Sequence, residues 1–92
     1  MPKFAKKRVI IQAEQFTGYN FPEIARFTNG GFRLLETPYI DHGLWITAQV
    51  HDYLHDTWVG VHDGDWILRG TKGEHYPVAK DVFGDLYEPV PA

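Results

Sequence analysis

The fold is decided by residues 44–50, Leu-Trp-Ile-Thr-Ala-Gln-Val, whose side chains alternate with a period of two. One predicted face holds Leu44, Ile46, Ala48 and Val50, and the other holds Trp45, Thr47 and Gln49. A period of two is that of a β-strand, because successive side chains of a strand point to opposite faces of its sheet. We therefore expect a strand over 44–50, and the rest of the chain is interpreted outward from it.

Similar strand patterns lie on both sides of this stretch. They predict strands at 8–16, 32–36, 57–61, 65–69 and 74–78. Residues 70–73, Gly-Thr-Lys-Gly, separate the last two strands and are expected to form a hairpin turn. They lack the spacing of a phosphate-binding loop and precede no predicted helix. The tail over 81–90 is expected to begin as a helical turn and to end extended.

One helix is predicted over residues 21–28. Asn20 is suited to the N-cap position, Pro22 to the first turn, and Glu23 to the third position of a capping box. Residues 29–31, Asn-Gly-Gly, supply a left-handed end. A helix of two turns is unstable alone in water, so packing must hold it in place.

A chain of 92 residues makes a single domain, residues 1–92. The pattern predicts an α+β fold with one short helix packed on an antiparallel, strongly curled sheet or small open barrel. The chain contains no cysteine, which excludes disulfides, thiol nucleophiles and cysteine-ligated zinc. We expect no membrane association, because no apolar run is long enough to span a bilayer and the N-terminus lacks the features of a signal peptide.

The net charge of −3 conceals an uneven distribution. Residues 1–33 carry six Lys or Arg and two carboxylates, whereas residues 34–92 carry three Lys or Arg and ten carboxylates. Such a distribution can steer a charged partner towards the protein. The carboxylates are scattered rather than gathered in a run, which favours the other interpretation, that the two halves are solvated surfaces that attract each other within the fold.

Four histidines lie close to aspartates between residues 41 and 63. They are His42, His51, His55 and His62, with Asp41, Asp52, Asp56 and Asp63 beside them. Both residue types ligate metals, and His55–Asp56 could form an acid–base dyad. However, on a strand, residues four apart are separated by about 13 Å, too far for one ion. We therefore expect no metal, no cofactor and no enzymatic activity, with a His/Asp metal-dependent enzyme as an alternative.

Aromatic residues are abundant, at 15 % of the chain. Seven of them could build a stacking platform or a protein interface: Trp45, Trp58 and Trp66, with Tyr39, Tyr53, Tyr76 and Tyr87. We expect most of them in the core and one or two on a face. Nucleic acid is not an expected partner, because no Lys or Arg lies between Arg33 and Arg69 to accompany the aromatic residues.

Several short motifs follow one another in a specific order. They are LHDTWV at 54–59, GDWILRG at 64–70 and GEHYPV at 73–78, together with KRVIIQAEQFTG at 7–18 and the end segments 81–83 and 87–88. This ordered set resembles a family of small proteins encoded by tailed bacteriophages, especially mycobacteriophages and other actinobacterial phages, with relatives in prophages. Members of that family usually carry Phe where this chain has His75. The resemblance covers nearly the whole chain and implies a phage product made in the cytoplasm of the infected bacterium.

The function expected from size, composition and resemblance is that of a phage accessory protein without enzymatic activity, which binds and modulates a host bacterial protein. The alternative is a binding protein for a small, nucleotide-like ligand, with aromatic residues and Arg69 or Lys72 at its pocket. The candidate binding residues are His55, Asp56, Trp58, Arg69, Glu74 and Tyr76. Segment 54–59 is the predicted functional surface, because an exposed imidazole and indole suit an interface. The alternative for this segment is a structural turn, with Trp58 in the core and His55 capping the turn.

Overall fold

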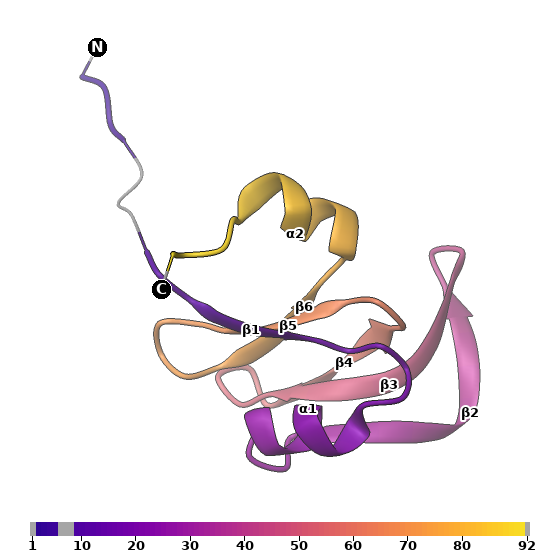
Figure 1. Cartoon of the computed structure of the whole chain (residues 1–92). Helices are drawn as coiled ribbons and strands as arrows, with labels where there is room; N and C mark the ends of the chain where they lie inside the picture. Colours follow the sequence, from indigo (N-terminus) through magenta and orange to yellow (C-terminus); the bar gives the residue numbers. More distant parts are fainter. Residues whose placement is uncertain (1, 6–8, 92) are drawn as a thin grey trace.

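The computed structural model describes residues 2–5 and 9–91, which form two helices and six strands. In chain order these are β1 (Gln12–Gln15), α1 (Phe21–Phe27), β2 (Phe32–Asp41), β3 (Leu44–Asp52), β4 (Thr57–His62), β5 (Trp66–Arg69), β6 (His75–Val78) and α2 (Lys80–Leu86) (Figure 1). The predicted α+β class is therefore confirmed. Neither helix of the described residues has the length and apolar character needed to cross a membrane.

The strands form two antiparallel sheets, which corrects the expectation of one curled sheet or open barrel. One sheet has the order β1-β5-β6 and the other β2-β3-β4. The two sheets are separate because both edges of β5 are occupied, one by β1 and the other by β6. Strand β5 therefore has no free edge with which β4 could pair. The chain crosses between the sheets at Gly64, which adopts a φ of 99° and donates its N–H to the carbonyl of Phe16 at 2.7 Å.

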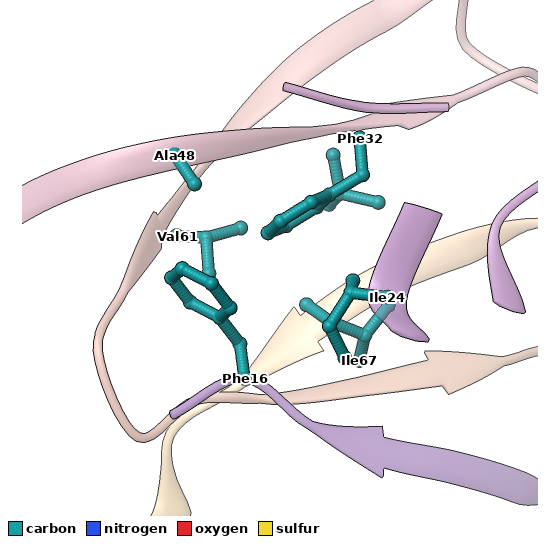
Figure 2. Close-up of a cluster of buried hydrophobic side chains, with 7 residues drawn as sticks. Phe16, Ile24, Phe32, Ala48, Val61 and Ile67 are labelled. Atoms are coloured by element: carbon teal, nitrogen blue, oxygen red, sulfur yellow. The ribbon is translucent and has the colours of Figure 1, made fainter. Parts of the chain in front are cut away.

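The core lies where the two sheets and α1 meet (Figure 2). Its buried members are Phe16, Ile24, Phe32, Ala48, Val50, Val61 and Ile67. The rings of Phe16 and Phe32 meet edge to face, with centroids 5.0 Å apart, an arrangement that aromatic quadrupoles favour. None of the three tryptophans and four tyrosines named above belongs to this buried cluster, so the expectation that most of them would be in the core is wrong.

Helix α1 occupies the predicted position to within one residue. Asn29 and Gly30 end it with φ values of 55° and 85°, which confirms the left-handed end. Asn20 stands at the N-cap position, yet its side chain makes no cap bond to the helix. Its Oδ1 instead accepts a hydrogen bond from the N–H of Thr17 at 2.9 Å, so the predicted capping box is wrong and Asn20 orders the turn before the helix.

The β2–β3 hairpin is longer than predicted. Strand β2 continues past residue 36, through Pro38, to Asp41. Proline is tolerated here because β2 is an edge strand and its register with β3 shifts between Leu34 and Tyr39, so a ladder donor is not required. The turn His42-Gly43 has φ values of 49° and 78°, as a two-residue type I′ turn requires. The hairpin tip stands out from the rest of the molecule in Figure 1.

Two terminal segments also differ from their predictions. Strand β1 begins only at Gln12, not at residue 8; residues 9–11 are described but lie outside the strand, and Arg8 lies outside the described residues. The predicted helical turn near residue 81 is a helix of seven residues, α2, so the fold has a second helix. The ring of Phe83 stacks on Trp66 at 4.3 Å between centroids, and this contact joins α2 to the β1-β5-β6 sheet.

Candidate functional site

A β-bulge decides which side chains share the solvent-facing side of the β2-β3-β4 sheet. Strand β3 uses two residues from Ile46 to Ala48 where β4 uses one, from His62 to Val61. Such a bulge reverses the alternation, so Ile46 moves to the face opposite Ala48 and Val50. This corrects the predicted strand face, which placed Ile46, Ala48 and Val50 together. We call the solvent-facing side the outer face; its members are Arg33, Tyr39, Ile46, Gln49, His51, Trp58, Gly60 and His62.

Gly60 makes room for an aromatic side chain on the outer face. A Cβ at position 60 would lie 2.9 Å from Cγ2 of Ile46 and 3.1 Å from the hydroxyl oxygen of Tyr39. Tyr39 and Ile46 therefore fill the space that any larger residue at position 60 would occupy. Ile46 is buried beneath this cover, whereas Tyr39 remains 41 % exposed. The outer face thus carries an apolar floor with an exposed phenol ring on it.

Beside this floor, the Trp58 indole contacts two side chains, Arg33 and His51. The guanidinium carbon of Arg33 lies 3.9 Å from the centroid of the indole, and the His51 ring lies 5.1 Å from it. Gln49 holds Arg33 in this position, because its Oε1 accepts hydrogen bonds from Nε at 2.9 Å and from Nη2 at 2.7 Å. Trp58 remains 36 % exposed, so the stack is ordered within the chain and still reachable from solvent.

The charge on Arg33 is not neutralised by a carboxylate. Among the described residues, no Lys or Arg side chain lies within 4.0 Å of a carboxylate, and the ion pairs that form are between His and Asp. Ion pairs between the described residues therefore do not explain the uneven charge of the two halves of the chain. Arg33 is also the only Lys or Arg between residues 27 and 68, a stretch with six carboxylates.

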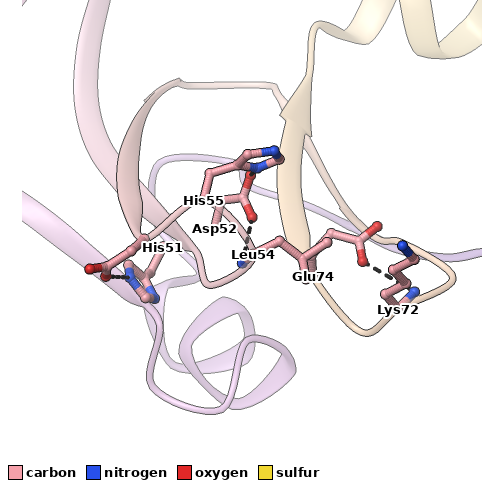
Figure 3. A network of polar contacts seen from close by, with 7 residues as sticks. His51, Asp52, Leu54, His55, Lys72 and Glu74 are labelled. Atoms are coloured by element: carbon pink, nitrogen blue, oxygen red, sulfur yellow. Dashed lines mark hydrogen bonds and ion pairs between the residues drawn. The ribbon is translucent and has the colours of Figure 1, made fainter.

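The β3–β4 turn and the β5–β6 turn, next to the segments LHDTWV and GEHYPV, meet at one edge of the molecule. Tyr53, in the β3–β4 turn, donates its hydroxyl hydrogen to the carbonyl of Lys72, in the β5–β6 turn. Each turn is closed by its own carboxylate, as Figure 3 shows. Asp52 accepts the N–H of Leu54 at 3.1 Å, and Glu74 accepts the N–H of Lys72 at 3.1 Å. The two turns, one from each sheet, therefore lie in contact.

Two His–Asp pairs lie at the β3–β4 turn. Nδ1 of His55 is 2.7 Å from Asp52, and Nε2 of His51 is 3.2 Å from Asp56. The hydrogen bond with His55 lowers the pKa of Asp52 below its ordinary value. The dyad of His55 with Asp56 that the sequence suggested is therefore wrong, because His55 contacts Asp52 and Asp56 contacts His51. The His55 side chain is 74 % exposed, so this turn does not shield a reaction from water.

Arg69 lies away from this surface and connects three elements. Its Nη2 donates to the carbonyl of Phe27 at 2.6 Å, its Nη1 donates to Gln12, and its Nε donates to Nε2 of His75 at 3.3 Å. The guanidinium also lies over the Phe27 ring, 4.5 Å from its centroid. Arg69 therefore ties α1 to β1 and β6, and few of its donors remain for a ligand.

Glu74 and Tyr76 also have contacts within the fold. The Glu74 carboxylate folds over Gly70, where a Cβ would overlap it, which explains the Gly at the start of this turn. Burial raises the pKa of Tyr76 above its ordinary value, and the neighbouring Tyr87 adds to the effect. The six predicted site residues thus occupy separate places: His55, Asp56 and Glu74 lie at the adjoining turns, Trp58 on the outer face, and Arg69 and Tyr76 on the other sheet.

Sequence reasoning missed Arg33, Gln49 and Tyr39. Arg33 and Gln49 are cross-strand partners, so a predicted register between β2 and β3 would have paired them. Tyr39 reaches the outer face only through the bulges, which the strand pattern does not reveal. Among the described residues, no three His, Asp or Glu side chains are grouped so that they could hold a metal ion.

Comparison with known proteins adds no relative to this description. No family model matches the chain, and searches of curated proteins and of solved structures find no match.

Proposed function

We propose that this chain is a phage accessory protein without enzymatic activity, which binds a host bacterial protein in the cytoplasm through the outer face. The observation that carries the proposal is the exposed Arg33–Trp58 stack, held in place by Gln49 and not neutralised by a carboxylate. Trp and Arg are the residue types that contribute most often to binding energy at protein interfaces. Because the stack is already ordered, binding loses little side-chain entropy.

The charge of the surrounding surface supports a protein partner over a nucleic acid. The stretch from residue 34 to residue 68 carries six carboxylates and no Lys or Arg. A phosphate backbone would be repelled by this surface, since nucleic-acid binding depends on neutralising phosphates with Lys and Arg. The complementary partner has an apolar centre, an acceptor group for Arg33, and Lys or Arg facing the turn that carries Asp52 and Asp56.

The alternative of a nucleotide-like ligand has less support. It relied on Arg69 or Lys72 to bind a phosphate, but Arg69 donates to three groups within the fold. The alternative of a His/Asp enzyme relied on a dyad, and His55 at the exposed turn lacks the enclosed cleft in which catalytic groups act.

Site-specific cross-linking tests the proposed surface. A photoreactive phenylalanine analogue replaces Tyr39 on the outer face, and the same analogue replaces the nearly fully exposed Tyr19 as the matched control. In a lysate of an actinobacterial host, we expect a saturable adduct with one protein at position 39 and none at position 19. Equal labelling at both positions, or no saturable adduct, would contradict the proposal.

The protein identified in this way is then purified and titrated. We expect Trp58→Ala and Arg33→Gln each to raise the Kd about fivefold or more, the loss typical of residues that dominate an interface. The control Tyr19→Ala leaves the Kd unchanged. If all three variants bind as the unmodified chain does, the outer face is not the binding surface.

A further inference from the structure

Each of the two sheets has two edge strands, and three of these four edges are interrupted. The edge strands are β1, β2, β4 and β6. Strands β2 and β6 contain Pro38 and Pro77, and proline lacks the N–H with which a further strand would pair. Strand β1 has only four residues, and its Gln15 carbonyl already accepts a hydrogen bond from Nδ2 of Asn20 at 2.8 Å. The fourth edge strand, β4, has none of these features.

Strand β4 has the composition and the exposure of an edge that a further strand can join. Its six residues, Thr57–His62, include no proline, Lys, Arg, Asp or Glu. Proline and charged side chains are the means by which natural proteins prevent pairing at an edge. Val59 packs against the core from this strand, yet it is only partly buried, which shows that the edge is open to solvent.

The backbone groups at this free edge belong to Trp58 and Gly60. The N–H of His51 donates to the carbonyl of Gly31 at 2.8 Å, so the backbone groups of His51 point away from β4. Trp58 is the register partner of His51, and its own backbone groups therefore point away from β3, as do those of Gly60 two residues later. Within the described residues, no hydrogen bond reaches these groups. Donors and acceptors with this spacing are satisfied by an added β-strand.

The side chains of β4 fit a second copy of the same strand. Two antiparallel copies related by a two-fold axis at Val59 place Trp58 of each copy opposite Gly60 of the other. This register pairs the outward N–H and C=O groups of both residues in both copies. It also sets the largest side chain of the strand opposite the residue that has none, and an aromatic residue across from an edge glycine stabilises a sheet.

The charges at the ends of the strand agree with this register. It brings the turn that carries Asp56 of one copy next to His62 of the other. The side chain of Asp56 is 96 % exposed, so it is accessible to a second copy. Since β4 itself contains no Lys, Arg or carboxylate, no like charges meet along the paired strands.

We propose that the protein forms a symmetric dimer in which β4 of one copy pairs antiparallel with β4 of the other. The two β2-β3-β4 sheets then make one continuous sheet of six strands. Because the two-fold axis is perpendicular to this sheet, both Arg33–Trp58 stacks lie on the same side of it. The dimer goes beyond the proposed function and does not depend on the proposed host partner.

Single cysteines test the register, since the chain contains no cysteine of its own. Across the axis, Val59 meets its own copy in a non-hydrogen-bonded pair, whose Cα atoms lie about 4.5 Å apart, within the range of a disulfide. We expect Val59→Cys to form a disulfide-linked dimer in oxidised glutathione. The matched control is Thr57→Cys on the same side of the strand. The two copies of residue 57 are offset by about 13 Å along the strands, too far for a disulfide.

Light scattering during gel filtration measures the mass over a concentration series. We expect the mass of the unmodified chain to rise from 10.6 kDa towards twice that value. Trp58→Phe keeps the ring and the N–H and is expected to dimerise as well. Trp58→Pro removes an N–H that points to the free edge and no hydrogen bond to β3, so it is expected to remain at 10.6 kDa. Thermal melting verifies that both variants fold, and if Trp58→Pro melts early, the two cysteine variants decide.

Three results would overturn the proposal. If the unmodified chain stays at 10.6 kDa at the highest concentration, the edge of β4 is left to a strand of another protein. Dimerisation of Trp58→Pro at the same concentration as Trp58→Phe would place the interface elsewhere. Cross-linking of Thr57→Cys as fast as that of Val59→Cys would exclude the axis at Val59.

Discussion

His55 presents its imidazole to solvent and contacts the chain mainly through the carboxylate of Asp52. We expect His55→Ala to change the free energy of unfolding by no more than about 0.5 kcal/mol, as is usual for surface substitutions. If segment 54–59 contributes to the binding surface, the same change weakens partner binding by about 1 kcal/mol or more. Urea unfolding and partner titration measure the two effects. A loss of about 1–3 kcal/mol in stability with unchanged binding would make the turn purely structural.

His75 is buried, and its Nε2 accepts the hydrogen bond from Arg69 only while the ring is neutral. Burial, and then the positive charge of Arg69, hold the pKa of His75 below its ordinary value of 6.5. Below that value the unfolded chain binds a proton that the folded protein resists, so stability falls as pH decreases from about 6.5 through the folded-state pKa.

The variant His75→Gln keeps an acceptor for Arg69 and removes the titrating group. We expect its melting temperature to fall less than that of the unmodified chain between neutral pH and about pH 5. Comparing the two chains removes the contribution of their shared carboxylates. Identical pH profiles for both chains would show that His75 does not titrate differently on folding.

Among the secondary-structure elements, α2 is joined to the β1-β5-β6 sheet by an aromatic stack. It has seven residues and none of them is buried, so the stack of Phe83 on Trp66 is its main attachment to the sheet. A helix this short does not persist alone. We expect Phe83→Ala to lower stability by about 1–2 kcal/mol and to speed amide exchange over residues 80–87. The control is Val82→Ala, at the exposed residue next to Phe83. Equal exchange in both variants would contradict this attachment.

The elements also show how far the sequence could predict this fold. The helix at 21–28 and most strand positions were predictable, because Asn29-Gly30 and the period-two patterns act locally. The two sheets were not, since the choice of β1 and β6 as partners of β5 depends on contacts between distant segments. The outer face was predictable only at Trp58, because Arg33 and Tyr39 join it through strand register and bulges.

The whole molecule depends on a small core shared by both sheets. Phe16 is fully buried and packs against Phe32 and the opposite sheet, so Phe16→Ala is expected to cost about 3–5 kcal/mol. That is a large share of the roughly 5–15 kcal/mol that stabilises a domain. Phe4→Ala, at an exposed phenylalanine, is expected to change stability by less than about 0.5 kcal/mol. Equal urea midpoints for the two variants would contradict the shared core.

We propose that the outer face of this two-sheet molecule binds a protein. The most direct test of this proposal is an NMR titration. The amide and indole chemical shifts of the ¹⁵N-labelled chain are followed as the purified host protein, identified by cross-linking, is added. We expect the shifts to concentrate on Arg33, Tyr39, Gln49, His51 and the Trp58 indole, with residues 80–91 unaffected. A footprint confined to residues 80–91, or none at saturating partner, would contradict the proposal.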